Sequence, residues 1–244
     1  METITSRDNA ALKHIARLGR DLSYRREHGL MLCEGGKMLA EALSAGVTPV
    51  HAVFAEGQER ELPPETRVMS VTGRLMGSLS PLDTPQSVLF TAAMPDTVLK
   101  NVKGGIILDR LQDPGNVGSI IRTARAFGIP AVILTEGCAD VSNPKTLRAA
   151  MGAVFSQRVM RGSAEGVWEL VKGGRVYATG MRADAVNIRD AVLKDCFALI
   201  GNEGGGLSDY WLDKGLGMLT IPIEFESLGA AAAAAIIMWE MKRC

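Results

Sequence analysis

The sequence has no apolar run long enough to cross a membrane. A spanning helix needs roughly 20 mostly apolar residues, and the uninterrupted run at residues 230–239 is about half that length. The opening stretch METITSRDNAALKHIARL also lacks the apolar core of a signal peptide. We therefore expect a cytoplasmic protein that has no membrane partner.

Charge of one sign and paired cysteines are also missing. The 27 basic and 27 acidic residues cancel, which argues against unspecific nucleic-acid binding but leaves room for a local basic patch. Cys33, Cys138, Cys196 and Cys244 lie far apart and form no CxxC pair. Neither a disulfide framework nor a metal site is predicted, and a reducing compartment fits best.

Residues 1–95 have the pattern of a small α/β domain. A helical spacing of apolar residues begins near Ser6 or Asp8, either of which is a candidate N-cap. Strand candidates follow at 29–35, 50–56, 66–72 and 87–94. A polar, glycine-ended stretch then predicts a linker at 96–104, followed by a second domain at 105–244.

The second domain alternates apolar strands with helical stretches. Strand candidates are 105–109, 131–137, 175–180, 197–204 and 217–223, each followed by a loop marked by glycine or proline. This alternation is typical of a mostly parallel sheet that is covered on both faces. Ligands of such sheets bind at the carboxyl ends of the strands, so the loops that follow the strands are the places to seek chemistry.

The usual phosphate fingerprints are absent from these loops. The stretch DPGNVGSIIRTARAFG fits neither the P-loop nor the GxGxxG spacing, which removes the support for a nucleotide-dependent oxidoreductase. This stretch combines a turn, a helix capped by Asn116 or Ser119, and Arg122, and together these features favour an anion-binding site. The alternative is a plain turn before a solvated amphipathic helix. Two other loops, LIGNEGGGLSD and IPIEFESLGAAAAAAI, are equally distinctive.

Together these three stretches resemble motifs 1, 2 and 3 of the SpoU (TrmH-like) branch of the SPOUT RNA methyltransferases, in the same order. The resemblance covers about residues 104–242, and the first 95 residues are similar to the L30e-like RNA-binding domain that many members carry. It implies a parallel-sheet domain with a deep trefoil knot, S-adenosylmethionine as cofactor and a homodimer. The implied reaction is methyl transfer to a ribose 2′-hydroxyl of structured RNA, with ribosomal RNA the expected substrate.

The resemblance also implies site residues. Those matched to the polar positions of the motifs are Asn116, Arg122, Glu203 and Ser227. Those expected to contact the cofactor are Thr179, Gly180, Gly201, Ile221, Leu228 and Gly229. A guanidinium does not readily lose a proton, so Arg122 is expected to clamp an RNA phosphate, with Glu203 and Asn116 orienting it. The RNA phosphate or water would take the hydroxyl proton.

One departure concerns the third motif. The family has asparagine where this chain has Gly229, and the preceding loop is about two residues short; we expect Glu224 or Glu226 to compensate. The departure keeps a second hypothesis open, namely a SpoU-like protein that binds RNA or ribosomes with weak or no methyltransferase activity.

The basic amino-terminal stretch supplies candidates for RNA contact, with a solvated helix face as the alternative. These candidates are Arg7, Lys13, Arg17, Arg25 and Arg26.

Overall fold

The computed structural model describes residues 1–182, 184–224 and 226–243. The chain forms two compact units: one joins Met1–Pro95 with Asp140–Phe155, and the other joins Asp96–Ala139 with Ser156–Cys244. No helix within the described ranges has the length and apolar character that crossing a membrane requires.

The first unit is built on a mixed five-stranded sheet in the order β1-β4-β3-β5-β2. Its strands are β1 (Glu2–Ile4), β2 (Leu30–Glu34), β3 (His51–Ala55), β4 (Arg67–Val71) and β5 (Val88–Ala93). Its helices are α1 (Ala10–Arg20), α2 (Leu22–His28), α3 (Gly36–Ser44), α4 (Gly73–Leu79) and α6 (Pro144–Ala150), with a short 3-10 helix at Ala153–Phe155. Four of the five strands match the predicted ones; β1 was not predicted.

Helix α1 forms because a polar cap precedes a regular apolar stripe. The side chain of Asn9 accepts hydrogen bonds from the backbone N–H groups of Ala11 and Leu12, so Asn9 is the cap and not the predicted Ser6 or Asp8. Leu12, Ile15 and Leu18 are buried in the core between the helix and the sheet.

A segment from far along the chain completes this unit. Helix α6 packs against β2, and the ring of Phe155 lies 6.3 Å from that of Phe90. Gly152 permits the approach: its φ is +89°, and a Cβ there would lie 2.6 Å from Cβ of Glu41. The prediction of consecutive domains, 1–95 and 105–244, does not anticipate this return of the chain.

Acid should weaken the first unit through two histidines. Burial lowers the pKa of His14 and of His51 from the ordinary value of 6.5, and neighbouring positive or titratable groups lower both further. As pH falls below about 6.5, the unfolded chain takes up protons before the folded chain does, so the free energy of unfolding must decrease. Urea unfolding at pH 7.5 and pH 5.0 tests this. The loss of stability should be smaller in His51→Asn, and an equal loss in both proteins would contradict the assignment.

The second unit contains a seven-stranded sheet in the order β10-β12-β9-β11-β6-β7-β8, and every neighbouring pair is parallel. Its strands are β6 (Gly105–Leu108), β7 (Val132–Thr135), β8 (Val159–Gly162), β9 (Arg175–Thr179), β10 (Val186–Asn187), β11 (Cys196–Ile200) and β12 (Gly217–Thr220). Its helices are α5 (Pro114–Phe127), α7 (Ala164–Val171), α8 (Asp209–Leu212) and α9 (Ala230–Arg243). The predicted parallel α/β architecture is confirmed.

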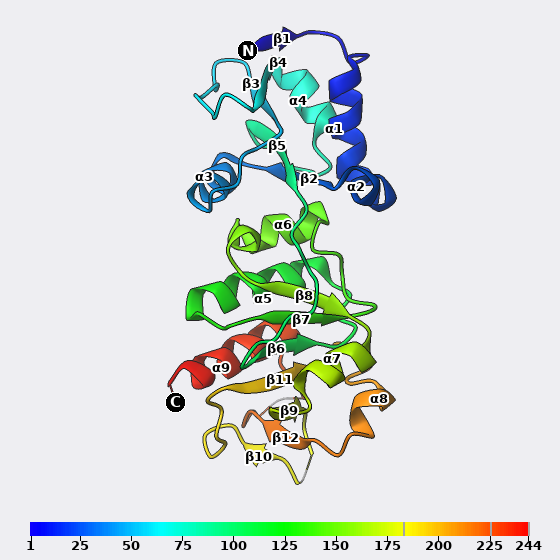
Figure 1. Ribbon diagram of the computed structural model, residues 1–244, viewed down its shortest axis with the longest axis vertical. Coiled ribbons are helices and arrows are strands. Elements are labelled where there is room, and N and C mark those ends of the chain that lie inside the picture. Colours follow the sequence, from blue (N-terminus) through cyan, green and yellow to red (C-terminus); the bar gives the residue numbers. More distant parts are fainter. Residues whose placement is uncertain (183, 225, 244) are drawn as a thin grey trace. The chain divides into compact units, whose positions relative to one another are not determined.

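Helices cover both faces of this sheet. Ile107, Ile133 and Leu199 join one buried cluster with Val167 of α7 and Trp211 of α8. Successive residues of a strand point to opposite faces of the sheet, so the residues next to Ile107, Ile133 and Leu199 in their strands point to the other face. On that face α5 and α9 lie side by side (Figure 1).

The alanine-rich helix α9 packs by means of its smallest side chains. Ala230 and Ala234 are buried together with Ile237 and Met238, and these positions recur at helical spacing. Small side chains let the backbones of α9 and α5 approach closely.

Two strands of this unit were not predicted. β8 reads VMRG, and β10 is two residues long, so neither has the apolar run that marks a buried strand. The predicted linker at 96–104 runs beside β8: the backbone N–H of Arg161 donates to the carbonyl of Thr97 at 2.7 Å. The trefoil knot stays a prediction.

Candidate functional site

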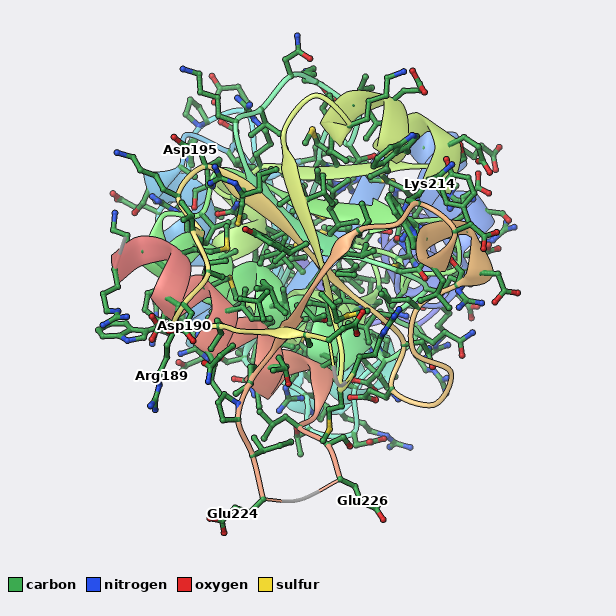
Figure 2. The ribbon with its side chains drawn as sticks, turned by 90° about the horizontal axis from the view of Figure 1, so that it is seen from below. Arg189, Asp190, Asp195, Lys214, Glu224 and Glu226 are labelled. Carbon is green, nitrogen blue, oxygen red and sulfur yellow. The ribbon has the colours of Figure 1, made fainter. Side chains whose placement is uncertain are left out.

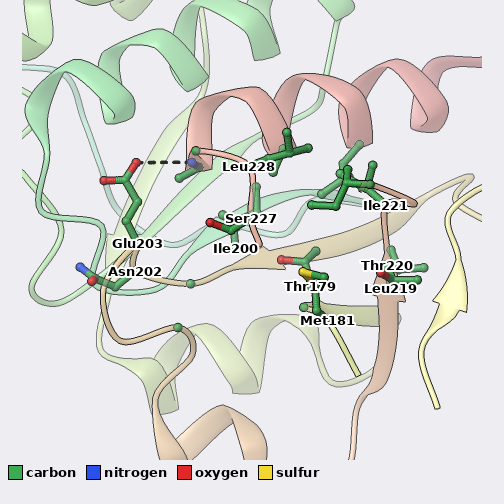
Figure 3. Close-up of a pocket in the computed structure, with 18 residues that line it drawn as sticks. Thr179, Met181, Ile200, Asn202, Glu203, Leu219, Thr220, Ile221, Ser227 and Leu228 are labelled. Atoms are coloured by element: carbon green, nitrogen blue, oxygen red, sulfur yellow. Dashed lines mark hydrogen bonds between the residues drawn. The ribbon is translucent and has the colours of Figure 1, made fainter. Parts of the chain in front are cut away.

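A cavity of about 300 Å³ opens at the carboxyl ends of β9, β11 and β12. The parallel strands bring the ends of these segments to one edge of the sheet, as expected for a ligand site. The first turns of α9 form its remaining wall (Figure 3). All six residues predicted to contact a cofactor line this cavity, and so do Glu203 and Ser227.

Several lining residues were not predicted. They are Met181, Ile200, Asn202, Gly206, Leu219, Thr220, Ile223, Ala230, Ala233 and Ile237. Most are apolar residues that look like ordinary core in the sequence, so only Asn202, next to Glu203 in the glycine-rich loop, had a visible signal.

Glu203 joins the three loops around this cavity. Its Oε1 accepts a hydrogen bond from Nδ2 of Asn116 at 2.6 Å and another from the backbone N–H of Ala230 at 3.4 Å (Figure 3 shows the latter). A carboxylate at the amino-terminal end of α9 is also favoured by the helix dipole. One side chain of the second motif thereby holds the first and third motifs in place.

This arrangement accounts for the missing asparagine. The carbonyl of Gly229 accepts the first hydrogen bond of α9, from Ala233 at 3.0 Å, so Gly229 occupies the cap position without a capping side chain. Glu203 caps the helix from the neighbouring loop. The expected compensation by Glu224 or Glu226 is wrong, because both lie at the tip of the loop before α9 and point away from the unit (Figure 2).

Replacing Glu203 should therefore lower the affinity of the cavity for its ligand, although the side chain of Glu203 is exposed. Glu203→Ala removes the oxygen that accepts both hydrogen bonds, and we expect the affinity for S-adenosylmethionine to fall about tenfold, since a hydrogen bond to a charged group contributes about 1.5 kcal/mol. Glu203→Gln keeps one carbonyl oxygen and should stay within about threefold of wild type. Isothermal titration calorimetry measures both; equal affinities for the alanine and wild-type proteins would show that the junction is dispensable.

Asn202 shapes the loop that carries Glu203. Its Oδ1 accepts from the N–H groups of Gly204 and Gly205 at 2.9 and 3.3 Å, and its Nδ2 donates to the carbonyl of Arg110 at 2.8 Å. Backbone bonds between Asn202 and Gly206, at 2.9 and 2.8 Å, close the loop. Hydrogen bonds within the loop, and one to the residue Arg110 that follows β6, therefore fix its conformation.

Asp109 is a buried anchor that the sequence analysis missed. Its side chain is almost fully buried, accepts from the N–H of Ser208 at 2.7 Å and from the hydroxyl of Thr135 at 3.2 Å, and lies 3.5 Å from Nε of Arg110. Arg110 has a φ of +53°, uncommon for a residue other than glycine. The signal was an acidic residue directly after the buried strand GIIL.

Arg122 lies on α5, away from these contacts. It is in the third turn of the helix, it is exposed, and it is not among the residues that line the cavity. Of the described residues, none forms a hydrogen bond or ion pair with its guanidinium, so the expected orientation by Glu203 and Asn116 is not seen. The helix is capped by Asp113, which accepts from the N–H of Asn116 at 2.7 Å; the prediction of Asn116 or Ser119 as the cap is wrong.

One candidate for RNA contact is a structural residue instead. Arg25 is only 4% exposed; its Nε donates to Oγ of Ser142 at 2.9 Å and its NH1 donates to the carbonyl of Leu18 at 2.9 Å. A guanidinium buried in this way cannot reach an external phosphate. Arg7, Lys13, Arg17 and Arg26 are exposed and stay candidates.

Comparison with known proteins agrees with the motifs. Residues 105–239 match the model of the SpoU rRNA Methylase family, and residues 9–90 match that of the MRM3-like substrate binding domain. The chain is 32% identical over 251 residues to the 23S rRNA (guanosine(2553)-2′-O)-methyltransferase RlmP of Bacillus subtilis, covering 99% of this chain and 100% of that protein.

Two further relatives cover nearly the whole chain. The 23S rRNA (uridine(2479)-2′-O)-methyltransferase of Streptomyces viridochromogenes is 31% identical, covering 98% of this chain and 91% of that protein. The crystal structure of AdoMet-bound rRNA methyltransferase from Sinorhizobium meliloti superposes with a TM-score of 0.85 at 27% identity, covering 99% of this chain and 97% of that one. The family resemblance inferred from the three motifs is confirmed.

Proposed function

Because the chain belongs to the SpoU rRNA methylase family, we propose that it transfers a methyl group from S-adenosylmethionine to a ribose 2′-hydroxyl of ribosomal RNA. The observation that carries the proposal is the junction at Glu203, which ties all three motifs around one cavity. The relatives named above supply the substrate class, since their names specify 2′-O-methylation of 23S rRNA.

The cavity has the character that this cofactor needs. Ile221, Leu228 and Ile237 provide apolar wall, and the loop at Gly201 provides backbone polar groups without side chains in the way. The hydroxyl of Thr179 donates to the carbonyl of Leu199 at 2.8 Å, so its oxygen stays available only as an acceptor. When bound, S-adenosylmethionine supplies an activated methyl group on a sulfonium centre.

The residues of the chain then have to align the ribose and help remove one proton. We assign to Arg122 the binding of the phosphate next to the target ribose, because its guanidinium is exposed and has no partner among the described residues. Ser227, exposed at the mouth of the cavity, hydrogen-bonds near the reacting hydroxyl. Asn116 and Glu203 hold the loops, and the proton passes to the phosphate or to water.

The proposal includes a homodimer in the cytoplasm, with the knotted domain at the interface and each site completed by the partner. The exposed side chains of Ile236 and Trp239 on α9 support an interface on this helix. Ala232 is exposed in the single chain, so Ala232→Leu fits the monomer but should disturb a partner that packs there. Sedimentation velocity of the two proteins tests this; an unperturbed dimer would argue for a different interface.

Transfer of tritiated methyl groups to bulk ribosomal RNA, followed by mapping of 2′-O-methyl sites, tests the function. Methylation at a defined ribose is the expected result. Cofactor binding by calorimetry without methyl transfer to any ribosomal RNA would favour the second hypothesis, a SpoU-like RNA-binding protein. Methylation of a base instead of a ribose would overturn the assigned reaction.

A further inference from the structure

The three histidines of the sequence lie together in the first unit, where the ring of His14 contacts those of His28, His51 and Tyr24. The ring centroid of His14 lies 5.0 Å from that of His28 and 5.7 Å from that of His51, and Tyr24 lies 4.2 Å from His28. These residues come from α1, α2 and β3. We call His14, Tyr24, His28 and His51 the aromatic cluster.

The aromatic cluster keeps unused hydrogen-bonding edges. Nδ1 of His14 pairs with the hydroxyl of Tyr24 at 2.9 Å, and Nδ1 of His51 pairs with Oγ1 of Thr91 at 3.0 Å. Within the described ranges, the second nitrogen of each ring and both nitrogens of His28 form no hydrogen bond. His28 is exposed and the other three rings are half-buried.

The positive charge at this place comes from an arginine. Cζ of Arg17 lies 4.1 Å from the ring centroid of Tyr24, in a cation–π contact. Burial first, and His28 second, lower the pKa of His14, so this ring is neutral at pH 7. Burial, His14 and Arg67 likewise lower the pKa of His51. Aromatic rings beside an exposed guanidinium are what proteins use to stack unpaired RNA bases.

A cationic groove adjoins the cluster. Arg7, Lys13 and Arg20 line a groove of about 400 Å³ between α1 and α4. Lys13, Arg17 and Arg20 follow one another at spacings of four and three residues, so they share one side of α1, and Arg17 stands between the groove residues and the rings. A track of cations beside aromatic rings matches a strand whose phosphates and bases are bound separately.

Two carboxylates already pair with these cations. Asp8 lies 2.7 Å from Nζ of Lys13, and Asp21 lies 3.3 Å from NH2 of Arg17. Exposed ion pairs of this kind are weak and are screened by salt, so an RNA phosphate can replace the carboxylate as partner.

We propose that the aromatic cluster, together with Arg17, stacks and reads an unpaired base of the RNA substrate, while Arg7, Lys13 and Arg20 bind the adjacent phosphates. This inference rests on the proposed function for its choice of RNA as the ligand. It assigns to the first unit the recognition of single-stranded nucleotides by their bases, and not only attraction to the phosphate backbone.

The test uses the exposed ring of His28. In the full-length protein, His28→Ala should raise the Kd for deproteinised ribosomal RNA about tenfold, since one stacked base contributes that much, whereas His28→Phe should stay within about threefold. A single-stranded RNA 12-mer with 2-aminopurine at its centre reports stacking directly: its fluorescence should be quenched by wild type and by His28→Phe, and not by His28→Ala.

Glu27→Ala is the matched control, because Glu27 is the exposed neighbour of His28 on α2. It should leave both readouts unchanged. Lys13→Ala should lower affinity and reduce the slope of log Kd against log salt by about one, without changing the quenching at saturation. Unchanged Kd and quenching in His28→Ala, or a His28→Phe protein as weak as His28→Ala, would overturn the proposal.

Binding and methyl transfer are measured separately, so the two proposals fail in different ways. If wild type binds and quenches but methylates no ribosomal RNA, the proposed function is wrong and the base site stands. If wild type methylates ribosomal RNA while His28→Ala keeps the wild-type KM and quenching, the base site is wrong and the function stands.

Discussion

Replacing Gly201 with alanine is expected to abolish the binding of S-adenosylmethionine, with a rise in Kd of at least about 100-fold. A Cβ at this position would lie 2.4 Å from the carbonyl carbon of Gly206 and 2.6 Å from the backbone nitrogen of Leu207. Both are backbone atoms, and the bonds between Asn202 and Gly206 hold that backbone in place. The loop has to open, at a cost of about 3 kcal/mol or more for backbone strain and lost hydrogen bonds.

Opening of the loop would also displace Glu203 and thereby release Asn116 and the start of α9. Calorimetric titration measures the affinity, and circular dichroism checks that the sheet is intact. Gly205→Ala is the matched control, because a Cβ at that position of the same loop would have no atom within 4 Å beyond Gly205 itself and its two chain neighbours. It should bind within about threefold of wild type. Wild-type affinity in Gly201→Ala would mean that the loop is not part of the cofactor site.

Arg122→Ala is expected to slow methyl transfer about 100-fold, because the phosphate beside the target ribose is then no longer held and the hydroxyl loses its alignment with the methyl group. The affinity for S-adenosylmethionine should not change, since Arg122 does not line the cavity. Arg122→Lys should recover little of the rate, because an ammonium group cannot make the two parallel hydrogen bonds that a guanidinium makes to a phosphate. Single-turnover methylation with saturating RNA measures these rates.

Arg125→Ala is the control for charge. Arg125 lies one turn later on the same helix, and its Nε donates to Oγ of Ser156 at 2.8 Å. It should keep the rate within about threefold of wild type. A near-wild-type rate in Arg122→Lys would contradict the two-bond contact between the guanidinium and the phosphate. A wild-type rate in Arg122→Ala would show that Arg122 has no part in the mechanism.

Residues at the ends of strands were predicted to line the cavity because their position at the edge of the sheet follows from the local pattern of apolar residues. Thr179 ends β9 and Gly201 directly follows β11, and buried parallel strands bring such positions to one edge of the sheet. The same pattern does not identify Asp109 as an anchor, although Asp109 too follows a buried strand, because nothing in the local sequence indicates that the N–H of Ser208 donates a hydrogen bond to it.

Contacts between residues that are far apart in the sequence could not be predicted from local sequence patterns. Arg25 reads as one more surface cation, and its burial depends on Ser142, 117 residues later. The return of α6 to β2 is equally invisible, since helix propensity does not say which sheet a helix covers.

Hydrophobic periodicity and the three motifs were thus enough for the parallel sheet, the family and the edge that carries the cavity, because strand burial and turn chemistry depend on neighbouring residues. Folding decided which carboxylate caps α9. A hydrogen bond such as that from Ala230 to Glu203 requires two groups, 27 residues apart, to lie within 3.4 Å with correct geometry, and only the packed chain brings them together.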